Sequence, residues 1–234
     1  MGTGHSGSRD DAVHLRSPLR DRDHAARLLA RRLTALHGQC PLVLGLPGGG
    51  VHMGRVISRV LDGELDVVLA RTLGAPHNPD LPIGAIDEGG RIHLNVAARH
   101  LCGDDRHVRH EASRQLGVMS AVRPLYRAIR ERADPSGRAV VVVDDGLGCP
   151  ELLLASLAAV RGLGPRWLVA ALGVASERTR QHAMQVADQI ECLHQAECGI
   201  EPHEFFGECS TVSDADAAES LAGYAMYTRP LPFP

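Results

Sequence analysis

Short apolar runs alternate with segments of helical periodicity along most of this chain, and that alternation restricts the fold more than any other feature. The clearest run, RAVVVV at 138–143, is apolar at consecutive positions, which predicts a strand buried on both faces. Strands are predicted at 41–46, 65–70, 138–143, 166–172 and 189–193, and helices at 21–36, 51–61, 151–160 and 176–187. Strands that alternate with helices predict an α/β fold with a doubly wound, mainly parallel sheet.

The middle of the chain departs from this alternation. Residues 73–82 are rich in Pro, Gly and Asn, which predicts a loop. Two short apolar segments, 83–87 and 91–94, flank a glycine turn, which is typical of a hairpin. Residues 104–132 have apolar positions at helical spacing, and Pro124 is expected to kink or split that helix.

The length of 234 residues is ordinary for one α/β domain, although two small domains stay open. We expect residues 1–14 to be a disordered tail, because Gly, Ser and charged residues dominate them. Residues 15–227 are predicted to form a single domain. The proline-rich end, 228–234, is predicted to be an extended arm.

Composition and charge exclude several classes of function. All 25 basic residues are Arg, so mechanisms that need a lysine, such as a P-loop or a Schiff base, are excluded. A net charge of -3 argues against a general nucleic-acid binder. The six cysteines form no C-x-x-C pair and indicate free cytosolic thiols. Without a signal peptide or an apolar run long enough for a bilayer, the chain is predicted to be cytoplasmic and free of membrane contact.

The turn after the first predicted strand is the first candidate site. It consists of Pro47, Gly48, Gly49 and Gly50. In open parallel sheets, ligands bind beyond the carboxyl ends of the strands. Successive glycine amides could form an anion-binding nest there, next to the positive end of the following helix. A tight turn that merely packs the helix against the strand is an equal alternative.

The second candidate site is the end of the run at 140–146, where Asp144 and Asp145 stand side by side. Two adjacent carboxylates repel each other and need a cation or hydroxyl donors to offset the repulsion. Ribose diols and Mg²⁺ both meet that need. The alternative is that one carboxylate caps a helix while the other is solvated.

Other residues give weaker signals. His107, His110 and Glu111 suggest a metal site, against which solvated helix residues are the simpler interpretation. Cys149 stands at a predicted helix start, where it is either a reactive thiol or a small buried cap. A dinucleotide-binding domain is the rival interpretation of the fold, but G-x-G-x-x-G is missing and Arg71 replaces the acidic residue expected after the second strand. The arginines of the first helix, Arg22, Arg27, Arg31 and Arg32, are expected to face solvent.

Together these segments resemble type I phosphoribosyltransferases, which use phosphoribosyl pyrophosphate (PRPP), and in particular one bacterial subgroup of them. The motifs are DRDHAARLLARRL (21–33), LVLGLPGGGV (42–51), the long block DVVLARTLGAPHNPDLPIGAIDEGG (66–90) and VVVVDDG (140–146). The segment FFGECSTVSDAD (205–216) is similar more loosely. The resemblance covers much of 19–172, in the expected order.

The resemblance implies a role for each candidate residue. Asp144 and Asp145 match the catalytic acidic pair that holds the ribose hydroxyls. The turn 47–50 matches the pyrophosphate loop, with Arg71 beside it. The 5′-phosphate loop corresponds to Gly146, Leu147, Gly148, Cys149, Pro150 and Glu151.

The resemblance also implies a small hood subdomain built from parts of about 72–135 and the C-terminal region. Its hairpin, with Asp87 and Glu88, would cover the acceptor. The implied cofactor is Mg²⁺, held through the ligand and the acidic pair rather than by a dedicated protein cluster. The expected ligand is PRPP or a nucleoside-like small molecule. A homodimer stays open as the assembly of the chain.

Three departures from the subgroup's pattern affect phosphate binding. Gly48 stands where the subgroup has Arg, and Thr72 stands where it has Lys. The Ala-Thr-Gly-Ala-Thr loop is replaced by 148–152, in which Pro150 lacks an N–H and Glu151 adds a negative charge. These two residues suit the first turn of a helix. We therefore expect phosphoribosyl transfer to a nitrogenous acceptor to be weak or lost, and the alternative is a non-catalytic nucleoside-binding or regulatory module.

Overall fold

The computed structural model describes residues 19–96, 98–102, 105–196, 202–208 and 210–228. The predicted N-terminal tail lies outside these residues, and so does the predicted C-terminal arm apart from Thr228. Within the described ranges, no helix has the length and apolar character needed to cross a membrane.

A five-stranded parallel sheet forms the centre of the molecule, with strand order β2-β1-β6-β7-β8. Its strands are β1 (Leu42–Gly45), β2 (Glu64–Val67), β6 (Ala139–Asp144), β7 (Trp167–Ser176) and β8 (Gln189–Ala196). The apolar run at 138–143 becomes the central strand, and its five valine and alanine positions are buried. The predicted α/β class and parallel sheet are confirmed, because alternation along the chain forces each strand to return in the same direction.

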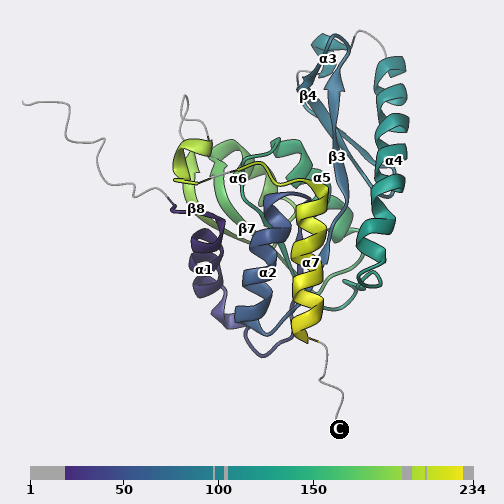
Figure 1. The fold of residues 1–234 in the computed structure, drawn as a ribbon. Helices are drawn as coiled ribbons and strands as arrows, with labels where there is room; N and C mark the ends of the chain where they lie inside the picture. The colour runs from purple at the N-terminus through teal and green to yellow at the C-terminus, as the bar shows by residue number, and fades with distance from the viewer. Residues whose placement is uncertain (1–18, 97, 103–104, 197–201, 209, 229–234) are drawn as a thin grey trace, which may run out of the picture.

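Helices cover both faces of this sheet (Figure 1). One face carries α1 (Arg22–Arg32), α2 (Gly49–Leu61) and α7 (Asp214–Thr228), and the other carries α5 (Pro150–Arg161) and α6 (Glu177–Ala183). Short 3₁₀ turns are present at Thr34–Leu36 and Pro202–Phe205. The sequence analysis left α7 unassigned, although Ser213 and Asp216 form a reciprocal cap at its start: the Asp216 N–H donates to Ser213 Oγ (3.2 Å), and the Ser213 N–H donates to Asp216 Oδ2 (2.8 Å).

A second, antiparallel sheet forms the hood, in the order β3-β4-β5. It contains β3 (Ala70–Ala75), β4 (Asn78–Asp87) and β5 (Ile92–Leu94), followed by α3 (Ala98–Leu101) and the long α4 (Asp105–Arg127). The hood projects from the parallel sheet, with α4 running beside it (Figure 1). The hairpin predicted between 83–87 and 91–94 is confirmed.

Two local predictions in this region are wrong. Residues 73–82 are not a loop, because most of them belong to the β3–β4 hairpin. The hairpin accommodates its prolines through register shifts around Gly74, where an added Cβ would lie 2.4 Å from the Pro79 carbonyl oxygen. Pro124 does not split α4, since it lies in the last turn, where little helix remains to be broken.

Candidate functional site

The acidic pair lies at the carboxyl end of the central strand, and its two members have different surroundings. Asp145 is buried and forms an ion pair with Arg22, with 2.8 Å between Oδ2 and Nε. Its other oxygen, Oδ1, accepts a hydrogen bond from the Leu147 N–H at 3.0 Å. Both oxygens of Asp145 are thus engaged inside the chain, which leaves Asp144 as the accessible member.

The partner of Asp145 corrects an expectation. Arg22 does not face solvent: it is 9% exposed, and its Nη1 also donates to the Ser210 carbonyl at 2.8 Å. It stands in the first turn of α1, at the same edge of the sheet as the acidic pair. Arg22 therefore ties α1, the acidic pair and the segment before α7 together.

Asp144 is partly exposed, and no residue within the described ranges forms an ion pair with it. Burial raises the pKa of Asp144 above its ordinary value, and the charge of Asp145 raises it further. The backbone N–H groups of Gly146 and Asp145 oppose that shift. Asp144 is thus a carboxylate that gains stability from any cation or hydroxyl donor brought to the strand end.

The glycine turn packs against this pair. Gly48 has φ 93°, a conformation that favours glycine, and α2 begins at the next residue. A Cβ on Gly49 would lie 1.9 Å from Asp145 Oδ2, and one on Gly50 would lie 2.4 Å from the Val143 carbonyl oxygen. Gly49 and Gly50 therefore serve close packing of helix against strand, which favours the tight-turn interpretation for these two positions.

Pro47 and Gly48, by contrast, line a cavity of about 540 Å³. The other walls come from the β3–β4 hairpin, from α4 and α5, and from residues 212–214 where α7 begins; they are Ala70, Arg71, Thr72, Pro79, Gln115, Leu152, Val212, Ser213 and Asp214. The structure thus brings Pro47, Gly48 and Arg71 to one cavity, and the family resemblance also places Arg71 beside this turn.

Arg71 is already neutralised within this cavity. Its Nη2 forms an ion pair with Asp214 Oδ2 at the start of α7, and both side chains are partly exposed. Tyr126, which is fully buried, donates from its hydroxyl to Asp214 Oδ1 at 3.2 Å. Burial and the Asp214 carboxylate raise the pKa of Tyr126, which stays protonated as a donor. Sequence reasoning missed Asp214, and the only signal was its place in the loosely similar segment 205–216.

The loop after the acidic pair leads directly into α5. Gly146 has φ 84°, and an added Cβ would lie 1.9 Å from the Val174 carbonyl oxygen. The prediction that Pro150 and Glu151 form the first helical turn is confirmed. The Cys149 thiol donates to Glu151 Oε2 at 2.8 Å, and burial together with this carboxylate raises the pKa of Cys149 to about 12. Cys149 is therefore a protonated helix-start residue, which contradicts its interpretation as a reactive thiolate.

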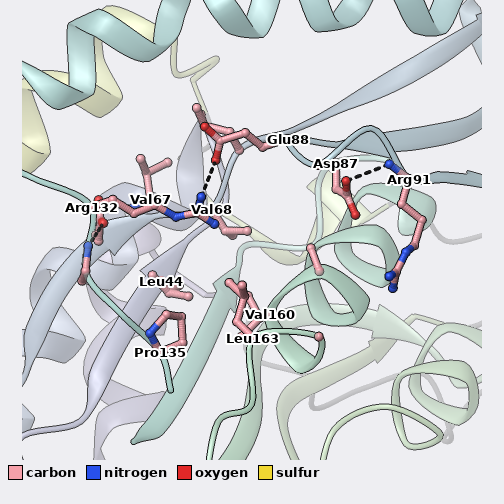
Figure 2. A pocket seen from close by; sticks show the side chains of 16 residues that line it. Leu44, Val67, Val68, Asp87, Glu88, Arg91, Arg132, Pro135, Val160 and Leu163 are labelled. Carbon is pink, nitrogen blue, oxygen red and sulfur yellow. Dashed lines mark hydrogen bonds and ion pairs between the residues drawn. The ribbon is translucent and has the colours of Figure 1, made fainter. Parts of the chain in front are cut away.

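Asp87 and Glu88 lie elsewhere. They are at the base of the hood, where they line a second cavity of about 310 Å³ (Figure 2). This cavity shares no lining residue with the cavity around Arg71. Glu88 pairs with Arg123 (2.5 Å) and Arg132 (3.6 Å). These contacts attach the hood turn to α4 and to the segment after it, so the structure does not place the two acids over the glycine turn.

The histidines of α4 do not form a metal site with their neighbour. Glu111 makes a two-pronged contact with Arg114, at 2.7 Å for each oxygen, and this guanidinium lowers the pKa of Glu111 to about 2. His107 bonds to the Gly74 carbonyl instead. In the described part of the chain, no group of three or more His, Cys, Asp or Glu side chains is arranged to hold a metal ion.

Comparison with known proteins gives concordant matches. Two proteins of Mycobacterium tuberculosis, named "Putative phosphoribosyl transferase Rv0571c" (strain H37Rv) and "Putative phosphoribosyl transferase MT0597" (strain CDC 1551), are each 34% identical to this chain over 176 residues. The match covers 74% of this chain and 39% of each relative, so the chain spans about two fifths of their length.

The crystal structure of TT1426 from Thermus thermophilus is also similar to this chain. It is 37% identical, with a TM-score of 0.72, and the match covers 88% of this chain and 99% of that protein. Comparison with models of protein families gives no match. The solved structure thus extends the similarity from the motifs to nearly the whole fold.

Proposed function

Since the chain belongs to the type I phosphoribosyltransferase family, we propose that it binds the ribosyl group of a small molecule at the end of β6, with Asp144 as the carboxylate that accepts from the ribose hydroxyls. The accessibility of Asp144 carries this proposal, because Asp145 already has Arg22 and a backbone N–H as partners. Asp145 would act through its neighbours, by fixing the backbone from which Asp144 projects.

The phosphate half of the site supports a further part of the proposal, that PRPP binds weakly and that phosphoribosyl transfer is weak or lost. Arg71 would contact a pyrophosphate only after losing Asp214 as its partner. Glu151 keeps a carboxylate at the start of α5, where a 5′-phosphate would otherwise meet free N–H groups. Two like charges at about 4 Å cost about 1 kcal/mol in water and several times more in a partly buried site.

A nucleoside-like ligand is the second candidate, and the charge balance of the cavity favours it. The side chains of Arg71 and Asp214 cancel each other, so the cavity offers polar groups without a net charge. A neutral ribosyl compound pays a smaller desolvation free energy on entering this cavity than a polyanion does. The chain would then be a binding module, consistent with a fold that supports many functions.

Of the acidic pair, only Asp144 is available to bind a divalent cation. Asp144 is a hard oxygen donor with a raised pKa, whereas Asp145 is held by Arg22. Mg²⁺ would therefore be held chiefly by the ligand's own oxygens, with Asp144 as the protein donor, and it would supply positive charge against the ligand's anionic groups. The chain's own contribution is to orient the ribose and to keep Asp144 ionised when the ligand is bound.

Calorimetric titration tests these proposals. The probes are PRPP with Mg²⁺, and adenosine, on the wild type, on Asp144→Asn and on the exposed control Glu219→Gln. We expect adenosine to bind and its affinity to fall about tenfold in Asp144→Asn, with the control unchanged. Equal adenosine affinity in Asp144→Asn would overturn the ribose role, and micromolar PRPP binding or pyrophosphate release would overturn the loss of the phosphate half.

A further inference from the structure

The cavity at the base of the hood has an apolar floor. Leu44 and Val67 contribute from β1 and β2, Val160 from the end of α5, and Leu163 from the turn that follows it. These side chains surround the hollow seen in Figure 2, where Val160 and Leu163 lie across from Leu44. The hood turn 87–91 also lines the cavity, so its polar wall carries Asp87 and Glu88 together with Arg91 and Arg132.

Three carboxylates stand at or near this cavity, and two of them have guanidinium partners. Asp66 pairs with Arg127 at 3.1 Å and also accepts from the Ala133 N–H at 2.9 Å. Glu88 is held by Arg123 of α4 and by Arg132, which follows α4 in the chain. Both of these acids are therefore compensated by charges within the chain.

Asp87 is the exception. It is only 3% exposed, and among the residues of the described ranges it forms no ion pair. Its Oδ1 accepts from the Arg91 backbone N–H at 2.9 Å, while the Arg91 side chain extends away from it (Figure 2). A buried carboxylate without a counter-charge is costly, and such groups in proteins are paired or meet a ligand.

We propose that this cavity is a binding site for a small organic cation, an amine or amidine. Its N–H groups donate to Asp87, and its apolar part packs against the floor formed by Leu44, Val67 and Val160. A volume of about 310 Å³ accommodates one ring with a cationic head. The site is separate from the proposed ribosyl site, because Asp144 does not line this cavity and the cavity shares no lining residue with the one around Arg71.

The backbone connects this cavity to Arg71, so a ligand bound here is linked to the second cavity through the chain. Leu69 lines the cavity, and its carbonyl accepts from the Glu88 N–H at 3.2 Å. Arg71 follows two residues later and lines the other cavity. A cation on Asp87 therefore sits on the hood turn whose backbone fixes the start of β3.

Three matched probes test the proposal: benzamidine, neutral benzamide and anionic benzoate, titrated against the full chain and followed by amide NMR shifts. We expect benzamidine alone to saturate, with shifts at 87–91 and 159–163. Asp87→Asn, which keeps an acceptor for the Arg91 N–H, is expected to weaken benzamidine binding about tenfold or more. Asp144→Asn is expected to leave it unchanged, which separates this site from the ribosyl site.

Ala159→Leu is a second variant that fills the cavity without touching a charge, and it is expected to abolish benzamidine binding. Leu suits the helix interior, so the variant should fold. Failure of benzamidine to bind, equal binding of benzamide, or unchanged affinity in either Asp87→Asn or Ala159→Leu would overturn the proposal.

Discussion

The two halves of the site at the carboxyl edge of the sheet differ in how their charged groups are held. Around Asp145, each group is fixed by close packing: Arg22 holds the carboxylate, and Gly49 leaves it just enough space. Around Arg71, charges cancel in a partly exposed cavity, with Asp214 in the place of an external anion. Steric constraints therefore restrict the surroundings of Asp145, in the half that we propose for ribose, whereas single charge changes alter the chemistry around Arg71, in the half that we propose for phosphate.

Removing Arg22 tests the packed half most severely. Arg22→Ala leaves Asp145 buried without its counter-charge, and breaking such a pair costs about 3–5 kcal/mol of unfolding free energy. Urea denaturation of the wild type, Arg22→Ala, Asp145→Asn and the double variant measures the effect. The double variant should recover part of the loss, and additive losses would show that the pair is not coupled.

A methyl group on the glycine turn gives the next largest effect. Gly49→Ala would place a Cβ 1.9 Å from Asp145 Oδ2, and overpacking of this kind costs about 1–3 kcal/mol. Gly148→Ala in the other half is the matched control, because nothing lies within 4 Å of its added Cβ. Thermal unfolding should show a lower Tm for the first variant and little change for the second. Equal losses would contradict the contrast between a packed half and an open one.

Removing the Asp214 charge, which frees Arg71, is expected to alter the affinity for pyrophosphate more than the stability of the fold. In Asp214→Asn the guanidinium loses its anionic partner, so pyrophosphate should bind about tenfold more strongly at low salt. The exposed Glu219→Gln removes the same charge from α7 and should have little effect. Stability should fall by only about 0.5–1 kcal/mol, because the pair is partly exposed. If calorimetry gives the same pyrophosphate affinity in both variants, Asp214 does not compete for Arg71.

The sequence is sufficient to predict the parallel sheet, because a strand such as 138–143 is buried whatever its neighbours are. The β3–β4 hairpin is not predictable in this way. Pro79 disfavours a strand locally, and only the register shift around Gly74 makes room for it. Local propensity therefore does not predict a strand whose irregular pairing accommodates a residue, such as Pro79, that disfavours strands.

The site shows the same division. Asp144 and the glycine turn can be proposed from the sequence, because strand ends of a parallel sheet meet at one edge, and the family resemblance adds Arg71. Arg22 and Asp214 cannot, since their partners lie 123 and 143 positions away in the chain. Helical periodicity places Arg22 among solvent-facing arginines, and only the position of α1 against the strand end reveals the buried ion pair.

The smallest effect concerns Asp144 and separates the two carboxylates by pH. A folded-state pKa above the unfolded value of about 3.9 makes the ionised group destabilising. The penalty is absent below that unfolded pKa, grows as the pH rises above it, and is complete above the raised folded pKa. Asp144→Asn should therefore raise the Tm by about 2–4 °C at pH 8 and leave it nearly unchanged at pH 4. A Tm gain that is equal at both pH values would show that Asp144 is as well compensated as Asp145, and the contrast between the free and the paired carboxylate would fail.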